Sequence, residues 1–219
     1  MPNTLSEPLF GGYERAYSES YQLAFDRLKS SDLGGICRCS RATRRSGNII
    51  GIRFLDREYT VDIDRQTITS ETGIPGITDS LVILHYLVTA TDEQRYAPHP
   101  ITFKELQDGR SYYPTFFKRA IAPVIERFGS SPDALIAAAE KYCGRPTSQG
   151  DVSVRFKVFP HVNLTWVLWS GDEEFPADGT VIFDATVSNF LPIEDIAALC
   201  QSIAMKLCSW TPRIHRAII

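Results

Sequence analysis

The side chains with the most potential for chemistry lie close together between residues 160 and 184. The candidates in this stretch are His161, Trp169, Asp172, Glu173, Glu174 and Asp184. Three adjacent acids after a strand could bind a hard cation through their oxygens, and two carboxylates in different surroundings could act as acid and base. The structural alternative is a charged turn in which one acid caps a helix, since adjacent acids on a strand alternate faces and do not all converge.

A second candidate site lies in the most hydrophobic segment of the chain. His85 and Tyr86 sit there, and at helical spacing His85 shares a face with Leu81, Leu84 and Val88. A buried histidine is most often hydrogen-bonded in the core, with its pKa lowered by burial. It could instead line a pocket as a base or a metal ligand. Both interpretations are open from the sequence alone.

Cys37 and Cys39 form the only close cysteine pair. On an extended loop they could bind a soft metal together with a third ligand such as Cys143, which makes them weak metal candidates. The four arginines between residues 38 and 45 would lower the pKa values of both thiols, and could themselves bind a phosphate or carboxylate group. The alternative is that two incidental cysteines lie in a solvated basic loop.

Several common catalytic and cofactor motifs are absent. The chain contains neither of the usual glycine-rich nucleotide loops, no zinc-protease helix and no nucleophile elbow. It has no Cys-x-x-Cys pair, so the spacing of a self-contained four-cysteine iron–sulfur site is missing. It also lacks the Asp-x-His-x-x-Gly signature of base-off corrinoid carriers. The sequence therefore predicts no intrinsic nucleotide or iron–sulfur cofactor and leaves the cofactor unknown.

The composition is that of a soluble globular protein, with 219 residues, 43% hydrophobic and 22% charged. The net charge of −3 argues against nucleic-acid binding, which relies on many phosphate contacts. No apolar run is long enough to span a membrane, and the first residues do not resemble a secretory signal. Five cysteines, an odd number, fit the reducing cytoplasm. We therefore expect a cytoplasmic protein with no membrane segment.

The candidate side chains are positioned by helices and strands that the sequence pattern predicts. Tyr17, Tyr21, Phe25 and Leu28 predict a first helix, which Gly34-Gly35 would end. Further helices are predicted over 79–91, from Pro114 with a break at Pro123, over 131–143, and from Pro192 onwards.

Alternating patterns predict two β-hairpins, 49–54 with 59–63 and 151–159 with 164–169. Residues 1–12 read as a flexible tail, and residues 13–219 as one α+β domain. Its core would be a mainly antiparallel sheet of two hairpins flanked by about five to six helices.

Three stretches together resemble a known family: Phe54-Leu55-Asp56-Arg57-Glu58-Tyr59, Ile83-Leu84-His85-Tyr86-Leu87, and residues 169–177 followed by Phe183-Asp184 and Phe190-Leu191-Pro192. In order and spacing they are similar to the domain-of-unknown-function family 3786 of anaerobic bacteria and archaea. The resemblance covers roughly residues 17–207. It implies no established activity. It does imply a link by context with corrinoid and one-carbon metabolism, and some members are fused to a small iron–sulfur domain.

The resemblance and the missing motifs together favour a ligand-binding or accessory protein in anaerobic corrinoid, iron–sulfur or one-carbon metabolism. Its partner would be a metalloprotein, a corrinoid protein or a small molecule. We expect a pocket between the helix carrying His85 and the acidic turn. One alternative is a metal-assisted enzyme that uses His85 or His161 as a base with acids of the 172–184 stretch. Another is a structural interaction domain, which predicts no cavity near His85.

Overall fold

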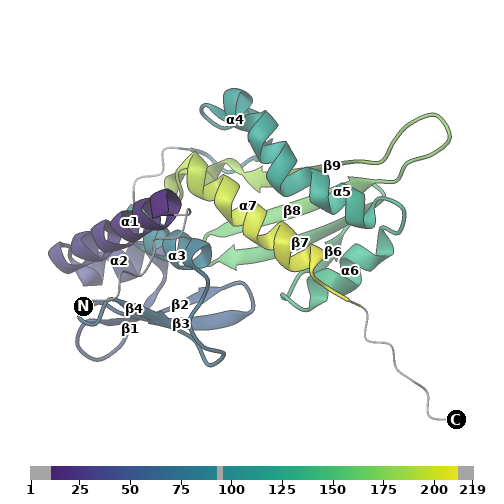
Figure 1. Ribbon diagram of the computed structural model, residues 1–219. Coiled ribbons are helices and arrows are strands. Elements are labelled where there is room, and N and C mark those ends of the chain that lie inside the picture. The colour runs from purple at the N-terminus through teal and green to yellow at the C-terminus, as the bar shows by residue number, and fades with distance from the viewer. Residues whose placement is uncertain (1–10, 93–95, 212–219) are drawn as a thin grey trace, which may run out of the picture.

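The computed structural model describes residues 11–92 and 96–211, which form an α+β fold with two antiparallel sheets (Figure 1). The smaller sheet has the order β1 (Thr43–Arg44), β2 (Ile49–Phe54), β3 (Arg57–Asp62) and β4 (Thr67–Thr69). The larger sheet has the order β5 (Pro100–Thr102), β9 (Asp178–Asp184), β8 (Val162–Trp169), β7 (Val152–Phe159) and β6 (Arg145–Thr147). The predicted fold class is confirmed.

The helices are α1 (Gly11–Ser30), α2 (Leu33–Ser40), α3 (Ile77–Thr89), α4 (Gly109–Phe116), α5 (Ala122–Phe128), α6 (Asp133–Glu140) and α7 (Ile193–Cys208). Two 3-10 turns, η1 (Phe103–Glu105) and η3 (Ala185–Asn189), and a π-helical turn, η2 (Phe117–Ile121), complete them. In Figure 1, α7 and the α4–α5 segment lie along the larger sheet, and α3 contacts both α1 and α7. Within the described part of the chain, no helix combines the length and hydrophobicity needed to cross a membrane.

Both predicted hairpins are present, and each forms the middle of its own sheet. The first closes through a two-residue turn, because Phe54 pairs with Arg57 and β3 therefore begins two residues earlier than expected. The second closes through Pro160 and His161, since Phe159 pairs with Val162. Buried and less buried residues alternate in β3, whereas β8 is buried along most of its length because side chains cover both of its faces.

The first hairpin contacts the larger sheet through a backbone hydrogen bond at its turn. Leu55 has a φ of 53°, a region that branched or bulky residues seldom adopt, and its N–H donates to the carbonyl of Val158 at 2.9 Å. That carbonyl is available because the β7–β8 register shifts between Lys157 and Phe159, as in a β-bulge. Phe54 and Phe159 also pack together, with 5.1 Å between ring centroids.

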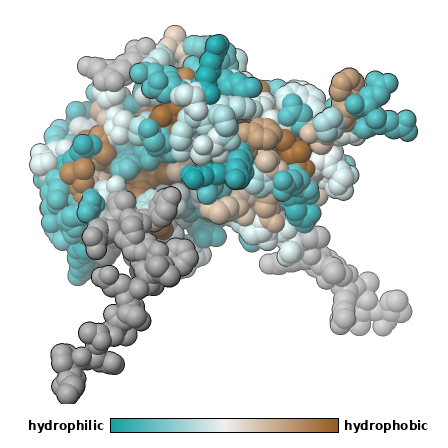
Figure 2. All heavy atoms as spheres, turned by 45° about the horizontal axis from the view of Figure 1, so that its top comes forward, coloured by the Kyte–Doolittle hydropathy of each residue, from teal (hydrophilic) through white to brown (hydrophobic). Residues whose placement is uncertain are grey.

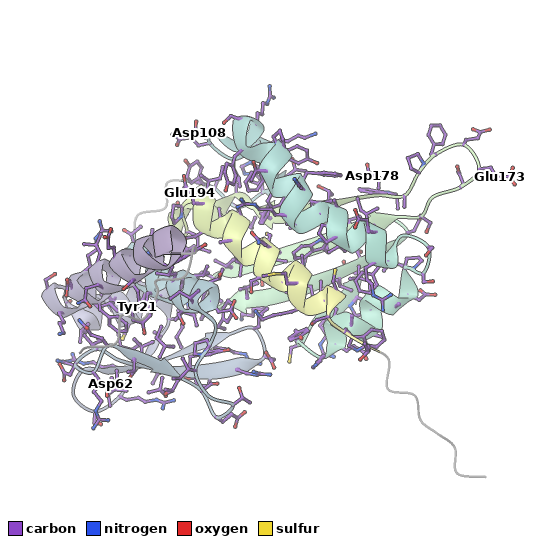
Figure 3. The ribbon with its side chains drawn as sticks, in the orientation of Figure 1. Tyr21, Asp62, Asp108, Glu173, Asp178 and Glu194 are labelled. Atoms are coloured by element: carbon purple, nitrogen blue, oxygen red, sulfur yellow. The ribbon has the colours of Figure 1, made fainter. Side chains whose placement is uncertain are left out.

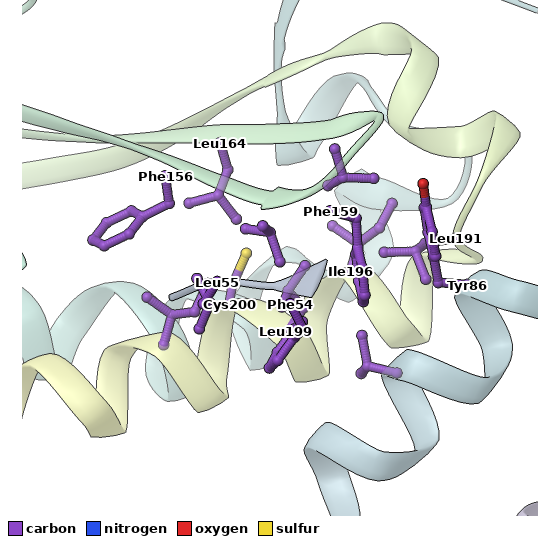
Figure 4. Close-up of a cluster of buried hydrophobic side chains, with 14 of the residues drawn as sticks. Phe54, Leu55, Tyr86, Phe156, Phe159, Leu164, Leu191, Ile196, Leu199 and Cys200 are labelled. Atoms are coloured by element: carbon purple, nitrogen blue, oxygen red, sulfur yellow. The ribbon is translucent and has the colours of Figure 1, made fainter. Parts of the chain in front are cut away.

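Hydrophobic residues of both sheets and of α7 belong to one buried cluster, part of which appears in Figure 4. The single domain over residues 13–219 remains a prediction, and this continuous core fits it. Residues 1–10 of the predicted tail lie outside the described residues, whereas Gly11 and Gly12 already belong to α1.

The prediction that Gly34-Gly35 ends the first helix is wrong. α1 ends at Ser30, and both glycines lie in the first turn of α2. Asp32 caps this helix, accepting hydrogen bonds of 2.9 Å from the N–H groups of Gly34 and Gly35. Glycine suits the site, because a Cβ at Gly35 would lie 2.9 Å from the Asp32 carboxylate.

The prediction that a helix opens at Pro114 is also wrong. α4 begins at Gly109, and Pro114 lies inside it. The expected break at Pro123 takes the form of the π-helical turn η2, which widens the backbone just before the proline. Gly109 lets α4 start against η1, since a Cβ there would overlap the carbonyl oxygen of Phe103.

Candidate functional site

His85 of α3 and Asp195 of α7 form a hydrogen-bonded pair, with 2.8 Å between Nδ1 and Oδ2. The His85 side chain is 28% exposed and that of Asp195 only 11%. A carboxylate accepts hydrogen bonds, so the neutral imidazole carries its proton on Nδ1 and keeps a lone pair on Nε2. The pair therefore presents an oriented imidazole nitrogen rather than a freely rotating ring.

The local sequence explains why the two side chains meet. α3 is apolar around most of its circumference and is buried between α1 and α7. Asp195 lies four residues before the buried Leu199, so it is on the buried face of α7 and near the helix N-terminus, where a carboxylate is stabilised by the helix dipole. The two helices thus bring residues 110 positions apart into contact.

A second polar cluster joins the same two helices. Lys206 donates to Asp79 at 2.7 Å and to Ser202 at 2.6 Å, and Ser202 donates to Asp79 at 2.5 Å. Asp79 and Ser202 are buried. Each buried polar atom in this cluster has a partner, so the cluster supports the α3–α7 contact without leaving an unsatisfied group.

His85 and Asp195 line a cavity of about 380 Å³ between α1, α3, α7 and the α4–η2 segment. Its wall includes Tyr112, Arg119 and Gln201 alongside apolar side chains such as Leu81 and Phe116. This volume lies near the lower end of the range for small-molecule pockets. The wall thus combines apolar side chains with polar and charged ones that can orient a ligand.

Arg119 and Glu194 place opposite charges at this cavity. Neither forms an ion pair with another residue in the described ranges, and both side chains are exposed. In Figure 3, Glu194 lies at the N-terminal end of α7. An anionic ligand group could pair with Arg119, while His85 Nε2 accepts a proton or binds a metal.

The acidic stretch lies elsewhere in the molecule. Figure 3 shows Glu173 at the tip of the loop between β8 and β9, and the same loop projects at the right of Figure 2 with a hydrophilic end. The Asp172 carboxylate accepts hydrogen bonds from the N–H groups of Glu174 and Phe175 at 2.8 and 2.7 Å. These bonds lower the pKa of Asp172. Glu173 and Glu174 are exposed. The loop therefore matches the alternative interpretation, a charged turn organised by one acid.

Trp169 and Asp184 occupy two further places. Trp169 is 41% exposed and borders an apolar hollow together with Phe175 and Pro176. Asp184 caps η3, accepting from the N–H and hydroxyl of Thr186 at 2.9 and 2.7 Å.

The prediction that the helix carrying His85 and the acidic turn share one cavity is wrong. None of the acids between residues 172 and 184 lines the cavity beside His85. The acid at that cavity that contacts His85 is instead Asp195. His161 is also distant from the acidic loop, because β8 runs between them and spans about 26 Å at about 3.3 Å per residue.

Tyr86 is a core residue. It is fully buried, its ring stacks on Phe159 with 4.0 Å between centroids, and its hydroxyl donates to the Ser40 carbonyl at 2.9 Å. Burial raises the pKa of Tyr86. Its adjacent position in the sequence to His85 therefore does not place it in the cavity.

His161 lies in the β7–β8 turn and stacks on Phe190, with 4.8 Å between ring centroids. Burial lowers the pKa of His161, and the positive charges of Arg41 and Lys157 lower it further. It lines a separate cavity of about 300 Å³ that Arg38, Cys39 and Arg41 also border.

The structure gives no support to a metal site at Cys37 and Cys39. Both lie on α2, and residues two positions apart on an α-helix are rotated by about 200° about its axis. The two thiols therefore point to opposite sides of the helix. Burial raises the pKa of each thiol and outweighs the nearby arginines, so the predicted lowering is wrong. Cys143, the suggested third ligand, is exposed beside β6. Among residues 11–92 and 96–211, no three His, Cys, Asp or Glu side chains are grouped to hold a metal.

Sequence reasoning missed Asp195 and Arg119. The sequence contains a signal for Asp195, because it is an acid on the buried stripe of the last helix. An acid near the start of a helix is, however, already explained by its favourable interaction with the helix dipole, so it does not by itself indicate a functional site. Arg119 had no such signal. It lies within the π-helical turn, whose altered period a regular helical pattern does not describe.

The fold and the cavity define an α+β protein with a histidine–carboxylate pair on the wall of a pocket of mixed polar and apolar side chains. A family model described as "Domain of unknown function (DUF3786)" matches residues 32–206, and the chain belongs to this family. A search of curated proteins and a search of solved structures each returned no match. The family match includes all the cavity residues discussed above, from Leu81 to Gln201.

Proposed function

We propose that this protein is a ligand-binding or accessory protein whose ligand occupies the cavity beside His85. The single observation that carries this proposal is the 2.8 Å contact between His85 Nδ1 and Asp195 Oδ2 at the wall of that cavity. A carboxylate that accepts from one imidazole nitrogen fixes the orientation of the ring and its tautomer. The Nε2 atom of His85 is then ready to bind a metal or accept a proton.

Two features of the cavity narrow the class of ligand. Arg119 has no ion-pair partner among the described residues, so it can bind a carboxylate or phosphate group. The volume of about 380 Å³ suits a small metabolite rather than a large macrocycle. A corrinoid or an iron–sulfur cluster would therefore be presented by a partner protein rather than enclosed in this cavity.

We infer the biological context from the family resemblance. We propose a role in anaerobic corrinoid, iron–sulfur or one-carbon metabolism with a metalloprotein or corrinoid protein as its partner, and, from the odd number of cysteines, a location in the cytoplasm. The family description itself assigns no activity.

A metal-assisted enzyme is the second candidate, and the same histidine–carboxylate pair favours it. In this version His85 acts as the base, and its acids are Asp195 and Glu194 instead of residues 172–184. The third idea, a structural interaction domain, predicted no cavity near His85, and the cavity described above argues against it.

The experiment is a set of anaerobic titrations with Zn²⁺, succinate and aquocobalamin as separate probes. Calorimetry follows the first two, and the absorbance of the corrinoid follows the third. We expect Zn²⁺ or succinate to bind, aquocobalamin not to bind because it is too large for the cavity, and His85→Gln to weaken Zn²⁺ binding by roughly 10- to 100-fold. Arg119→Met should weaken succinate binding by about tenfold.

Lys118→Met is the matched control, because Lys118 is an exposed neighbour of Arg119 that does not line the cavity. The proposal fails if the wild-type protein binds neither Zn²⁺ nor succinate. It also fails if His85→Gln and Arg119→Met bind them as the control does.

A further inference from the structure

Three positive side chains surround a hollow of about 480 Å³ where the two sheets meet. Arg53 comes from β2, Arg145 from β6 and Lys157 from β7. Among the residues that the structure describes, the wall contains no carboxylate. Its other residues are Leu55, Cys143, Phe159 and Pro160. This hollow has no lining residue in common with the cavity beside His85.

The three cations lack negative partners within the described ranges. None of them takes part in an ion pair there, although the chain contains 26 acids and only 23 lysines and arginines. Like charges around one hollow repel one another, because little solvent separates them. A bound anion would remove that repulsion, so the arrangement is electrostatically complementary to a negative ligand.

The backbone holds these cations in place from two sheets. The Leu55 N–H donates to the Val158 carbonyl at 2.9 Å, which joins the β2–β3 turn to β7. The Arg53 Nε donates to the Leu55 carbonyl at 3.3 Å, which leaves the two terminal nitrogens of its guanidinium for a ligand. Lys157 lies directly at the β7 irregularity, and such irregularities change the direction of side chains.

The floor of the hollow is apolar. Leu55 is 3% exposed and Phe159 1% exposed, and Pro160 lies beside them. The volume also exceeds the space that an inorganic anion needs, since one water-sized volume is about 30 Å³. A ligand that fills the hollow therefore has an organic part as well as a negative group.

The positive potential extends to the neighbouring turn. Burial lowers the pKa of His161, which follows Pro160 in the β7–β8 turn, and the positive charges of Arg41 and Lys157 lower it further. Of the three cations around the hollow, Lys157 therefore acts on a side chain next to the lining residue Pro160.

We propose that this hollow binds the phosphate group of a small organic phosphate. The guanidinium groups of Arg53 and Arg145 supply paired donors that match phosphate oxygens, Lys157 adds a point charge, and the apolar floor contacts the organic part. The site is independent of the function proposed for the cavity beside His85.

The test uses phenyl phosphate, inorganic phosphate and phenol as probes, with binding followed by calorimetry and by shifts in amide resonances. We expect phenyl phosphate to bind more tightly than inorganic phosphate, and phenol to bind most weakly. Arg145→Gln and Lys157→Gln should each weaken phenyl phosphate binding by about tenfold. The matched control is Lys29→Gln, which removes the same charge from an exposed position on α1.

Because the changed side chains are exposed, all variants should keep the wild-type circular dichroism spectrum and melting temperature. The proposal is overturned if phenyl phosphate shows no saturable binding up to ~10 mM. It is equally overturned if the two site variants bind phenyl phosphate as tightly as Lys29→Gln does. Phenol binding as tightly as phenyl phosphate would rule out the anion site, and equal binding of inorganic and phenyl phosphate would rule out the organic part.

Discussion

Lys206 Nζ lies 2.7 Å from Asp79 Oδ2, so an ion pair joins the last turn of α7 to the first turn of α3. The pair of His85 and Asp195 joins the two helices again, near the N-terminus of α7. The helices therefore run antiparallel and are linked at two levels. The cavity wall depends on both links, because one supplies its chemistry and the other holds the helices in register.

We expect Lys206→Met to lower the free energy of unfolding by about 2 kcal/mol, because the buried Asp79 carboxylate keeps only Ser202 as a partner. Methionine retains the apolar stem of the side chain, so the loss reports the charge rather than packing. Urea denaturation measures it. Arg65→Met breaks an exposed ion pair with Asp62 and should change stability by less than about 0.5 kcal/mol. Equal effects of the two changes would show that the α3–α7 pair has no special role.

The tautomer of His85 tests directly whether the hydrogen bond to Asp195 orients the imidazole ring. At pH 8 we expect its proton on Nδ1, because the Asp195 carboxylate accepts there, and Asp195→Asn should reduce this preference. Nitrogen chemical shifts of the imidazole ring measure the tautomer. His99 is the internal control, since its Nδ1 lies 2.9 Å from the Ala97 carbonyl and should be unaffected. A wild-type His85 with its proton on Nε2 would refute the proposed orientation.

His161 should make stability depend on pH. Its folded-state pKa lies below the ordinary value of 6.5, so the unfolded chain binds more protons at mildly acidic pH. The contribution of His161 is therefore complete above pH 6.5 and is lost as the pH falls through the lower folded-state pKa. We expect His161→Gln to show a smaller loss of stability than wild type between pH 7.5 and 5.5. Identical urea-derived pH profiles of the two proteins would contradict this.

Gly109 should tolerate no side chain. A Cβ at this position would overlap the carbonyl oxygen of Phe103, so Gly109→Ala forces η1 and α4 apart. We expect a loss of about 3 kcal/mol in the free energy of unfolding. Gly76→Ala is the control, because a Cβ at Gly76 has nothing within 4 Å, and it should cost less than about 1 kcal/mol. If the Gly109 variant is as stable as the control, this close approach does not limit the start of α4.

The cysteines should differ strongly in their reactivity towards a disulfide reagent. Cys143 is exposed and should react first, whereas Cys200 is fully buried and burial raises its pKa. We therefore expect Cys200 to react only on unfolding. Cys143→Ser should remove the fast phase of the reaction while Cys208→Ser leaves it unchanged. A fast phase that survives in Cys143→Ser would place the reactive thiol elsewhere.

The secondary-structure elements that can be predicted from the sequence are those with a short-range pattern of apolar residues. The alternation of Val152, Val154 and Phe156 predicts β7, and the pattern of Leu81, Leu84 and neighbouring apolar residues predicts the buried helix α3. Both are confirmed, because side chains that alternate with the period of a strand or a helix must share a face. The three carboxylates at 172–174 are just as easy to recognise in the sequence. Whether they form a binding site or a charged turn depends on which other residues the fold brings near them.

The amino-acid sequence by itself therefore determined the class of fold, both hairpins and the presence of a histidine in the most apolar helix. Only the tertiary structure decided that His85 pairs with Asp195, and that Arg53 meets Arg145 and Lys157 at the seam of the sheets. The physical reason is distance along the chain. The whole core determines how α3 packs against α7, and it determines the irregularity in β7 that leaves one carbonyl free to bond with Leu55. Neither feature can be predicted from the periodicity of a short stretch of sequence.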